Sequence, residues 1–455
     1  MTPDLKTKKR KLLIGNIEVE VAGLSIDSRS IKPGEVFFAL QGNKVDGHQF
    51  VSKALDNGAI AAVIEDIAYH KESRTILVDN VLNTLKESGI FLKNSANPKC
   101  MIGITGSVGK TTTKAWLSKI LNYYHKSFTT MNNYNTIYGL PIALSNIEDE
   151  TEYCILEMGT SRAGEISDLS SYLSPDIGII TNIFESHIGY FNNKLELAKE
   201  KISITDGMHA GSILIFDGDS EFAETIKAAA LAKQIRTLSV GFSSNCDIRI
   251  ISGQRSVIRT THNEYSFQLS IHGRKYDYIA GCVVALLFAL GLEIEKFLAY
   301  FTKLKPLPGR GEIITCNYYD KKFTLIDESY NASPAAMLAA IDTFLGQSHA
   351  PPLVAIIGQM NDLGRYEEYY HKLVAERLAT CNLNSFFFIG RQELWKIYPK
   401  AICYEGLNEG IIKNILDHIP KDALILLKGS NSIHLGEIPN YILSSSHRLT
   451  SSLRK

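Results

Sequence analysis

Short apolar runs alternate with polar segments along the whole chain, and their spacing divides it into three regions. The first region, residues 1–90, mixes strand-like runs with polar turns and closes on a helix-like stretch. The runs are "EVFFAL" (35–40), "AAVIE" (61–65) and "TILV" (75–78), and the helix-like stretch is "VLNTLKESGIFLKN" (81–94). This mixture predicts a small α/β domain.

In the second region, residues 91–310, an apolar strand runs directly into glycines, and strand-like and helix-like segments then alternate. The segments are "CMIGITG" (100–106), "TEYCILEMG" (151–159), "GEISDLSSYL" (164–173), "DIGIITNI" (176–183), "KLELAKEKISI" (194–204) and "SILIFDGD" (212–219). Such alternation predicts a mostly parallel sheet with helices on both faces. The prolines and glycines of "KPLPGRGE" (305–312) predict a hinge at its end.

The third region, residues 311–455, repeats the alternation on a smaller scale. Its segments are "FTLIDES" (323–329), "PAAMLAAIDTFL" (334–345), "PLVAIIGQM" (352–360), "YHKLVAERLATC" (370–381), "SFFFIG" (385–390), "AICYE" (401–405) and "ALILLKGS" (423–430). We expect a Rossmann-like α/β domain here. The predicted fold is therefore α/β with three domains.

Composition and charge balance exclude some classes of binding partner. Hydrophobic residues make up 45% of the 455 residues, as in ordinary globular proteins. Lys and Arg together number 48, and so do Asp and Glu. A protein that binds nucleic acid usually carries a basic excess, so we do not expect nucleic acid as a partner. The one basic run, "KTKKRK" (6–11), is interpreted as a solvated N-terminal arm.

Cysteine usage and hydropathy predict a cytoplasmic protein. None of the seven cysteines stands in a C-x-x-C pair, which argues against a zinc site or a disulfide framework and for a reducing compartment. The longest apolar run, "AGCVVALLFALGL" (280–292), is shorter than the ~20 residues that a membrane-spanning helix needs. No signal peptide is recognisable after the basic run.

The strongest chemical signal is "TGSVGKTTTK" (105–114), between a strand and the helix-like "TTKAWLSKILNYY" (112–124). Backbone N–H groups at such a helix start attract phosphate oxygens. Lys110 would reach the β- and γ-phosphates, and the Thr111 hydroxyl would bind Mg²⁺. Ile104 stands where the strict P-loop pattern has its first glycine, and Gly106 supplies the flexibility instead. The nucleotide-binding residues predicted here are Thr105, Gly106, Ser107, Val108, Gly109, Lys110, Thr111 and Thr112. A glycine turn that merely caps a helix is the alternative.

ATP binding alone leaves the reaction open, and the remaining motifs decide it. Their order and spacing resemble those of the Mur ligase family over nearly the whole chain. They are "IDSRSIKPGEVFFALQGNKVDGHQF" (26–50), "TGSVGKTTTK" (105–114), "EMGTSRAGEISDL" (157–169), "TNIFESHIGYF" (181–191), "LAKEK" (197–201), "PGRGE" (308–312), "IDESYNASPAAM" (326–337) and "LLKGSNS" (426–432). The resemblance implies a UDP-sugar-binding first domain, an ATP-binding central domain and a C-terminal ligase domain that binds the incoming substrate.

Within the family, "DESYNASPAAM" is similar to members that join D-alanyl-D-alanine to UDP-MurNAc-tripeptide in peptidoglycan precursor synthesis. The implied reaction has two steps: ATP phosphorylates the tripeptide carboxylate, and the dipeptide amine then displaces phosphate. Two alternatives stay open. One is a Mur-type ligase that adds a diamino acid, although the "DNPR"-like motif of those members is absent. The other is a nucleotide-binding partner protein without turnover.

The resemblance also implies which residues carry the chemistry. Two Mg²⁺ ions would be held by Thr111, Glu157, His187 and Lys201, the last as a carbamate. Glu157 ends an apolar strand, and His187 follows the next one, at the edge where open α/β sheets bind ligands. Lys201 stands fourteen residues after His187, with Lys199 as its competitor and Ser203 where the family often has Glu. Lys110, His187, Lys201 and Arg310 are the implied catalytic residues, with Arg310 stabilising the transferred phosphate.

Further residues are implied for nucleotide and substrate binding. Asp327, Glu328 and Asn331 are expected near the nucleotide. The substrate-binding candidates are Ser28, Arg29, Asp46, Gly47, His48, Asn135, Thr136, Ser161, Ser333, Lys428, Ser430 and Asn431. The chain departs from the family pattern at Thr136 and Asn431, and at Ile279 and Cys282, where asparagines near adenine are common. We expect a monomer whose domains close around the substrates.

Overall fold

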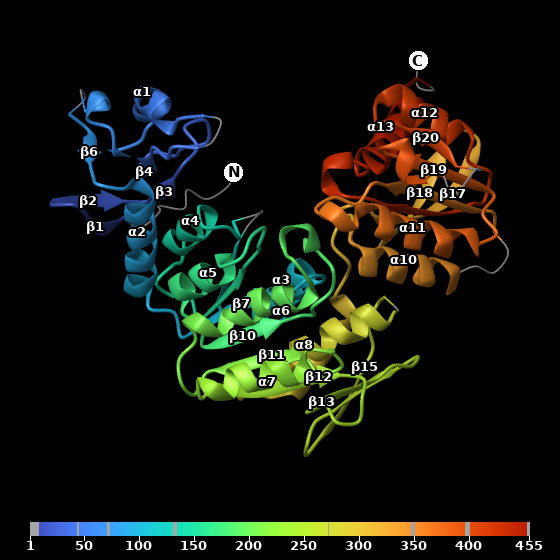
Figure 1. Ribbon diagram of the computed structural model, residues 1–455, viewed down its shortest axis with the longest axis horizontal. Helices are drawn as coiled ribbons and strands as arrows, with labels where there is room; N and C mark the ends of the chain where they lie inside the picture. Colours follow the sequence, from blue (N-terminus) through green and yellow to red (C-terminus); the bar gives the residue numbers. More distant parts are fainter. Residues whose placement is uncertain are drawn as a thin grey trace.

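The computed structural model describes residues 9–42, 45–70, 73–130, 134–271, 273–346, 351–395 and 401–452. Figure 1 shows three α/β units, with the blue N-terminal unit and the orange-red C-terminal unit on opposite sides of the central one. Each unit is built around its own sheet. The predicted fold class, α/β with three domains, is confirmed.

The N-terminal unit contains a parallel sheet and a separate antiparallel hairpin. The sheet strands, in spatial order, are Gly23–Ser25 (β3), Glu35–Phe38 (β4), Ala61–Ile64 (β5) and Thr75–Leu77 (β6). The hairpin is Arg10–Ile14 (β1) and Ile17–Val21 (β2), and the helices are Gly47–Phe50 (η1), Val51–Asp56 (α1), Ile67–Tyr69 (η2) and Val81–Ala96 (α2).

The central unit has the largest sheet, with spatial order β15-β14-β13-β12-β11-β10-β7-β9-β8. From β8 to β13 neighbouring strands are parallel, and β14 and β15 run antiparallel at one edge. The strands are Cys100–Thr105 (β7), Ser127–Thr129 (β8), Tyr153–Glu157 (β9), Ile177–Ile180 (β10), Ile213–Asp217 (β11), Arg236–Gly241 (β12), Ile248–Ile251 (β13), Ser256–Arg259 (β14) and Glu264–Phe267 (β15). This arrangement confirms the predicted mostly parallel sheet.

Helices cover both faces of the central sheet, and each face has its own apolar core. Ile102 and Ile104 of β7 pack on the side of α3 and α8, whereas Cys154 and Leu156 of β9 pack on the side of α5 and α7. The helices are Lys110–Leu121 (α3), Gly139–Ser145 (α4), Glu165–Leu173 (α5), Ile188–Tyr190 (η3), Lys194–Ile202 (α6), Ser203–Gly207 (η4), Ala223–Ala232 (α7), Arg274–Ala289 (α8), Ile294–Leu298 (α9) and Phe301–Lys303 (η5). Because both faces are buried, the strands read as continuous apolar runs.

The C-terminal unit has a sheet of order β16-β17-β21-β18-β19-β20, parallel except for the first pair. Its strands are Glu312–Tyr318 (β16), Lys321–Glu328 (β17), Leu353–Gly358 (β18), Ser385–Ile389 (β19), Ile402–Tyr404 (β20) and Leu424–Lys428 (β21). Its helices are Pro334–Gly346 (α10), Gly364–Tyr366 (η6), Glu367–Ala379 (α11), Gln392–Trp395 (η7), Glu409–Asp417 (α12), Asn431–Ile433 (η8) and Glu437–Ser452 (α13). The carboxyl ends of β17, β18 and β21 therefore lie next to one another.

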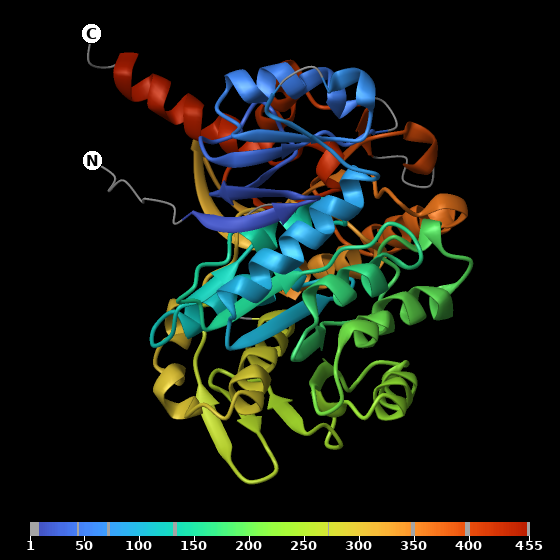
Figure 2. The same cartoon turned by 90° about the vertical axis from the view of Figure 1, so that its left-hand side faces the viewer.

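Polar contacts fix the N-terminal unit to the central one, where α2 runs along the teal helices (Figure 2). Arg10 Nη1 donates to the carbonyl of Ile147 in the central unit, at 3.1 Å, and to that of Leu92 in α2 of its own unit, at 3.0 Å. Lys93 Nζ donates to the carbonyl of Leu173, at 3.1 Å, at the end of α5. The interpretation of residues 6–11 as a solvated arm is therefore wrong for Arg10, because its guanidinium donates hydrogen bonds to backbone carbonyls. Residues 6–8 of that run lie outside the described residues.

Two global properties bear on the sequence predictions. All seven cysteines are free. Among the residues that the structure describes, no helix has both the length and the apolar character to cross a membrane.

Candidate active site

The loop between β7 and α3 has a backbone that only glycine suits at two points. Gly106 has φ 137°, and a Cβ there would lie 2.0 Å from Thr181 Oγ1. Gly109 has φ 88° and precedes the first residue of α3, Lys110. Lys110 Nζ donates to the carbonyl oxygen of Gly106 at 2.7 Å, so the loop curls around its own lysine. This shape leaves the N-terminus of α3 facing the ligand space, as phosphate binding requires.

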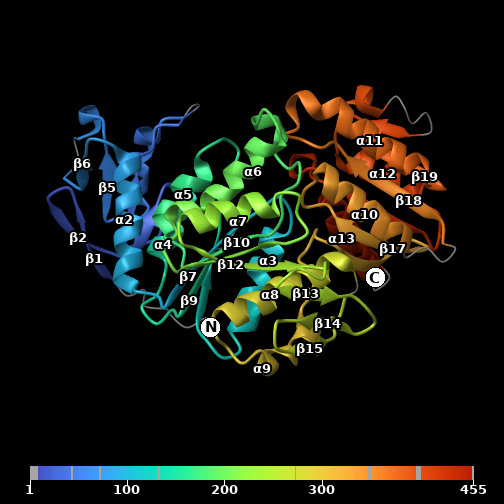
Figure 3. The same ribbon diagram turned by 60° about the horizontal axis from the view of Figure 1, so that its bottom comes forward.

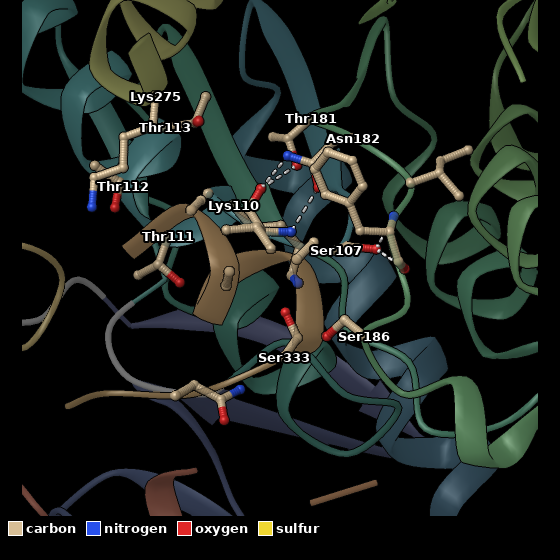
Figure 4. A pocket seen from close by; sticks show the side chains of 18 of the residues that line it. Ser107, Lys110, Thr111, Thr112, Thr113, Thr181, Asn182, Ser186, Lys275 and Ser333 are labelled. Carbon is tan, nitrogen blue, oxygen red and sulfur yellow. Dashed lines mark hydrogen bonds between the residues drawn. The ribbon is translucent and has the colours of Figure 1, made fainter. Parts of the chain in front are cut away.

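A second loop, which follows β10, braces the phosphate loop (Figure 4). Asn182 Oδ1 accepts from Val108 N at 2.8 Å, and Asn182 Nδ2 donates to the Val108 carbonyl at 2.9 Å. The Thr181 hydroxyl donates to the same carbonyl at 2.8 Å. Ser107 Oγ donates to the carbonyl of Phe184 at 2.7 Å. These contacts between protein groups hold the phosphate loop in shape.

Thr111 and Glu157 meet at the mouth of this loop. Thr111 Oγ1 donates to Glu157 Oε2 at 3.0 Å, and Asn135 Nδ2 lies 3.5 Å from Glu157 Oε1. A hydroxyl beside a carboxylate is an oxygen pair of the kind that Mg²⁺ uses next to phosphates, so these residues fit that ion. Among the described residues, no group of three or more His, Cys, Asp and Glu is placed to hold a metal by itself. Most of the ligands would therefore have to come from the nucleotide and from water.

Arg310 reaches the same point from the linker between the central and C-terminal units. Its Nη2 donates to Thr111 Oγ1 at 3.0 Å, and its guanidinium carbon lies 3.8 Å from the centre of the Tyr330 ring. Tyr276 donates to the backbone carbonyl of Arg310 at 3.1 Å. The linker arginine therefore contacts the phosphate-loop threonine, and its expected role toward the transferred phosphate stays a prediction.

These groups line a cavity of about 980 Å³ between the central and C-terminal units. Of the predicted site residues, the cavity is lined by Ser107, Val108, Gly109, Lys110, Thr111, Thr112, Asn135, Thr136, Glu157, Ser161, His187, Lys201, Arg310, Glu328, Asn331, Ser333, Lys428 and Asn431. Thr105 is buried beneath the loop. The structure therefore brings these predicted residues together around one cavity, and their individual roles stay predictions.

Lys201 is a deeply buried ionisable group on the wall of the cavity. Its side chain is only 1% exposed, and burial, with a smaller contribution from the neighbouring Lys110, lowers its pKa to about 7. Its neighbour Glu200 is fixed by the backbone N–H groups of Gly164, at 2.7 Å, and Ile166, at 2.9 Å. Lys199, the competitor in the sequence, is exposed. Of the two lysines, Lys201 is the one that lines the cavity.

The chain matches three family descriptions in succession. They are "Mur ligase family, catalytic domain" (residues 20–91), "Mur ligase middle domain" (104–286) and "Mur ligase, glutamate ligase domain" (309–431). The chain belongs to the Mur ligase family.

Two relatives that are similar along nearly the whole length of this Mur ligase are both named UDP-N-acetylmuramoyl-tripeptide–D-alanyl-D-alanine ligase. One from Rickettsia prowazekii is 29% identical over 92% of this chain and 94% of its own, and one from Bacillus subtilis is 28% identical over 93% and 94%. The solved MurF ligase of Thermotoga maritima in complex with ADP shares the fold. Its TM-score is 0.80 at 24% identity, covering 94% of this chain and 98% of that one.

In this Mur ligase the C-terminal unit contributes charged and polar groups to the cavity. Glu328 accepts from Lys275 and, at 3.4 Å, from Lys428 Nζ. Burial alone would raise the pKa of Glu328, but the two lysines outweigh it and lower that pKa. Asp327, in contrast, is not among the residues that line the cavity, and it accepts from the backbone N–H of Ser329 at 3.0 Å. Asp327 is thus placed as a turn residue, and its nucleotide role stays a prediction.

The predicted substrate-binding residues differ in whether their polar atoms already have hydrogen-bond partners in the protein. The hydroxyl of Ser333 is buried without a hydrogen-bond partner and points into the cavity (Figure 4). Ser430, by contrast, accepts from the backbone N–H of Asn361 at 2.8 Å. The two departures from the family pattern on α8 also differ. Ile279 lines the cavity, whereas Cys282 is buried in the hydrophobic core.

The N-terminal candidates lie apart from the cavity and bind one another. His48 Nδ1 lies 2.7 Å from Asp46 Oδ1, and the backbone N–H of Glu65 donates to His48 Nε2 at 3.1 Å. Arg29 forms two hydrogen bonds with the carboxylate of Asp27, at 2.9 and 2.8 Å. A substrate role for Ser28, Arg29, Asp46, Gly47 and His48 stays a prediction.

Sequence reasoning missed two residues next to the predicted ones. Asn182 lies inside the recognised "TNIFESH" segment, but its bonds to Val108 could not be read from the sequence. Asp362 accepts from His187 at 3.1 Å, across the boundary between the central and C-terminal units. The position of Asp362 shortly after strand β18 could have indicated its role, since residues that face ligands often lie at the ends of parallel strands.

Proposed function

We propose that this Mur ligase uses ATP to join the carboxylate of UDP-MurNAc-tripeptide to the amine of D-alanyl-D-alanine. The observation that carries the proposal is the convergence on one cavity of Lys110 and Thr111 from α3, Glu157 from β9 and Arg310 from the linker before β16. The shared name of the relatives supports the choice of substrates, since each covers more than nine-tenths of the chain.

In the first step a carboxylate oxygen attacks the γ-phosphorus, the bond from that phosphorus to the bridging oxygen breaks, and ADP leaves. The carboxylate thereby gains a phosphate leaving group. Lys110 and the N-terminus of α3 would bind the β- and γ-phosphates, and Arg310 would face the group in transfer. Their contribution is positioning and charge neutralisation, because anionic oxygens must be brought together.

In the second step the dipeptide nitrogen attacks the acyl carbon, the carbon–oxygen bond to phosphate breaks, and the amine loses a proton. We place the incoming amine beside the C-terminal wall of the cavity, where Asn331, Ser333 and Lys428 lie. Lys428 is held by Glu328 and by the carbonyl of Asn331, 3.1 Å from its Nζ. These groups would orient the dipeptide toward the acyl phosphate.

Magnesium would supply charge balance for the phosphates, held at Thr111 and Glu157. His187 and a carbamate on Lys201 would serve a second ion. The structure offers a physical reason for carbamylation at this lysine. Only the neutral amine adds CO₂, and a pKa of about 7 leaves a large neutral fraction at neutral pH. The carbamate, the two-ion arrangement, the cytoplasmic location and the monomeric state stay predictions.

A panel of amines tests the proposal directly. Purified protein receives ATP, Mg²⁺ and one of two acceptors, UDP-MurNAc-tripeptide or the acceptor shorter by one residue. Each acceptor is tested with D-alanyl-D-alanine, a diamino acid, or no amine, and ADP and amide product are both quantified. We expect ADP and product to appear in equal amounts with the dipeptide. Turnover with the diamino acid on a shorter acceptor would instead identify the alternative ligase. ADP formation without any amide would refute both.

A further inference from the structure

The segment that follows β10, residues 181–192, contacts two distant parts of the molecule. At one end Asn182 and Thr181 brace Val108 of the phosphate loop. At the other end the segment lies against the C-terminal unit around η6, where green and orange ribbons meet in Figure 3. His187 lies between the two ends, on the wall of the cavity.

The contact with the C-terminal unit is centred on Asp362. Its Oδ2 accepts from His187 Nδ1 at 3.1 Å, and its Oδ1 accepts from the Tyr190 hydroxyl at 2.8 Å. Its backbone carbonyl accepts from Gly189 N at 2.9 Å. One residue thus binds three members of a short turn that belongs to the other unit.

The backbone on both sides of this contact has a fixed shape. His187 has φ 64° and Asp362 has φ 61°, so both adopt the left-handed conformation. Gly189 packs so closely on the C-terminal loop that a Cβ would lie 2.5 Å from Gly364 N. Neither side can shift without loss of these contacts, so the His187 ring is oriented by the C-terminal unit.

The bond to Asp362 has a chemical consequence for His187. A carboxylate acceptor fixes the proton on Nδ1, which leaves the lone pair of Nε2 for a ligand in the cavity. Partners of this kind orient histidines that bind metals, and their removal weakens metal binding about 10- to 100-fold in other proteins.

We propose that Asp362 is a positioning residue: it orients His187 toward the metal and phosphates, and so couples docking of the C-terminal unit to the nucleotide site. The proposal rests on the metal role proposed for His187. It predicts that the site is complete only when the C-terminal unit is docked, so the acceptor is phosphorylated only in the closed enzyme.

The test measures Mn²⁺ binding to the full-length protein in the presence of ADP, by the electron paramagnetic resonance signal of free Mn²⁺. Asp362→Asn keeps the side-chain volume but removes the charge. We expect it to weaken Mn²⁺ binding about tenfold. Asp342→Asn is the matched control, since Asp342 is an exposed carboxylate on α10 that pairs with Arg377. That control should bind Mn²⁺ as the wild type does.

A double substitution separates positioning from a general structural role. If Asp362 acts through His187, adding Asp362→Asn to His187→Ala should weaken Mn²⁺ binding no further. Additive losses would overturn the proposal, as would Asp362→Asn with an affinity within twofold of the wild type. Should Asp362→Asn fail to fold, Tyr190→Phe removes only one of the two side-chain bonds. Because that variant keeps the bond between Asp362 and His187, its Mn²⁺ affinity should stay within twofold of the wild type, and a larger loss would overturn the proposal.

These measurements use no peptide substrate, so they are independent of the amine panel. A protein that fails to form the amide but loses Mn²⁺ in Asp362→Asn would contradict the proposed function and keep the coupling. The reverse pattern would keep the ligase and reject the role of Asp362.

Discussion

The phosphate loop and the Asp46–His48 pair are both dense polar clusters, yet they are built in opposite ways. In the N-terminal unit His48 is 3% exposed, and both its ring nitrogens already have protein partners. Around the phosphate loop, the half-buried Lys110 has the buried Lys201 and Arg310 as close neighbours, and desolvation lowers the pKa of both lysines.

This difference indicates which of the two clusters is suited to bind an anionic ligand. Burial of like charges costs free energy that an anionic ligand can offset. The polyphosphate of a nucleotide is such a ligand, and the cations around the loop are stabilised when it binds. The Asp46–His48 cluster has no comparable cost of buried like charges for a ligand to offset. Its measurable contribution should therefore be to the stability of the N-terminal unit.

The largest expected effect is at Lys110. Lys110→Ala removes the cation that reaches the phosphates, and we expect ADP formation to fall at least ~10³-fold, as for loss of a group that neutralises charge in a transition state. The rate of ADP release under saturating ATP measures this. Lys119→Ala, at an exposed position on the same helix, is the control. A Lys110→Ala variant with more than a tenth of the wild-type rate would break the comparison.

The next effect concerns Lys201 and pH. Its folded-state pKa of about 7 lies below the ordinary value of 10.5, so between those values the unfolded chain binds more protons than the native one. The free energy of unfolding of the wild type should therefore rise as pH increases from 7 to 9. This rise should exceed the rise in Lys201→Met by on the order of 1–3 kcal/mol.

Urea titrations at both pH values measure this difference, with Lys199→Met as an exposed control on α6. Parallel pH profiles for the wild type and Lys201→Met would show that the burial of Lys201 carries no such cost.

A smaller effect is expected in the N-terminal cluster. His48→Ala removes two buried hydrogen bonds and a ring contact with Tyr69, whose centroid lies 5.3 Å away. We expect a loss of about 2–3 kcal/mol in the free energy of unfolding, with KM for ATP unchanged. Denaturant titration and steady-state kinetics test both halves. Normal stability with a large rise in KM for the UDP-linked substrate would mean that His48 serves a ligand.

The smallest effect is expected at Arg29, whose side chain is 79% exposed and paired only with Asp27 among the described contacts. Arg29→Ala should leave the unfolding midpoint unchanged. If Arg29 contacts the diphosphate, KM for the UDP-linked substrate should rise about fivefold, the effect of one lost hydrogen bond. An unchanged KM would remove Arg29 from the substrate site.

The sequence predicted the sheets and the phosphate site because both have local signatures. The apolar runs of β7, β9 and β10 and the glycines at 106 and 109 are readable residue by residue. The choice of Lys201 over Lys199 came from family spacing alone, and burial now gives a physical reason for it.

Other features depend on contacts that no local pattern records. Arg10 was assigned to a solvated arm because nothing near it in sequence shows the carbonyls of Leu92 and Ile147 that it meets. Asp362 stands 175 positions from His187, so their pairing follows only from how two units dock.

The most direct test of the central claim follows the oxygen atoms of the acceptor carboxylate. UDP-MurNAc-tripeptide labelled with ¹⁸O in its terminal carboxylate is incubated with the enzyme, ATP, Mg²⁺ and D-alanyl-D-alanine, and the released phosphate is examined by mass spectrometry. Our account predicts one ¹⁸O atom in each phosphate released, because the carboxylate oxygen leaves with the transferred group. Phosphate without the label, formed alongside the amide product, would contradict it.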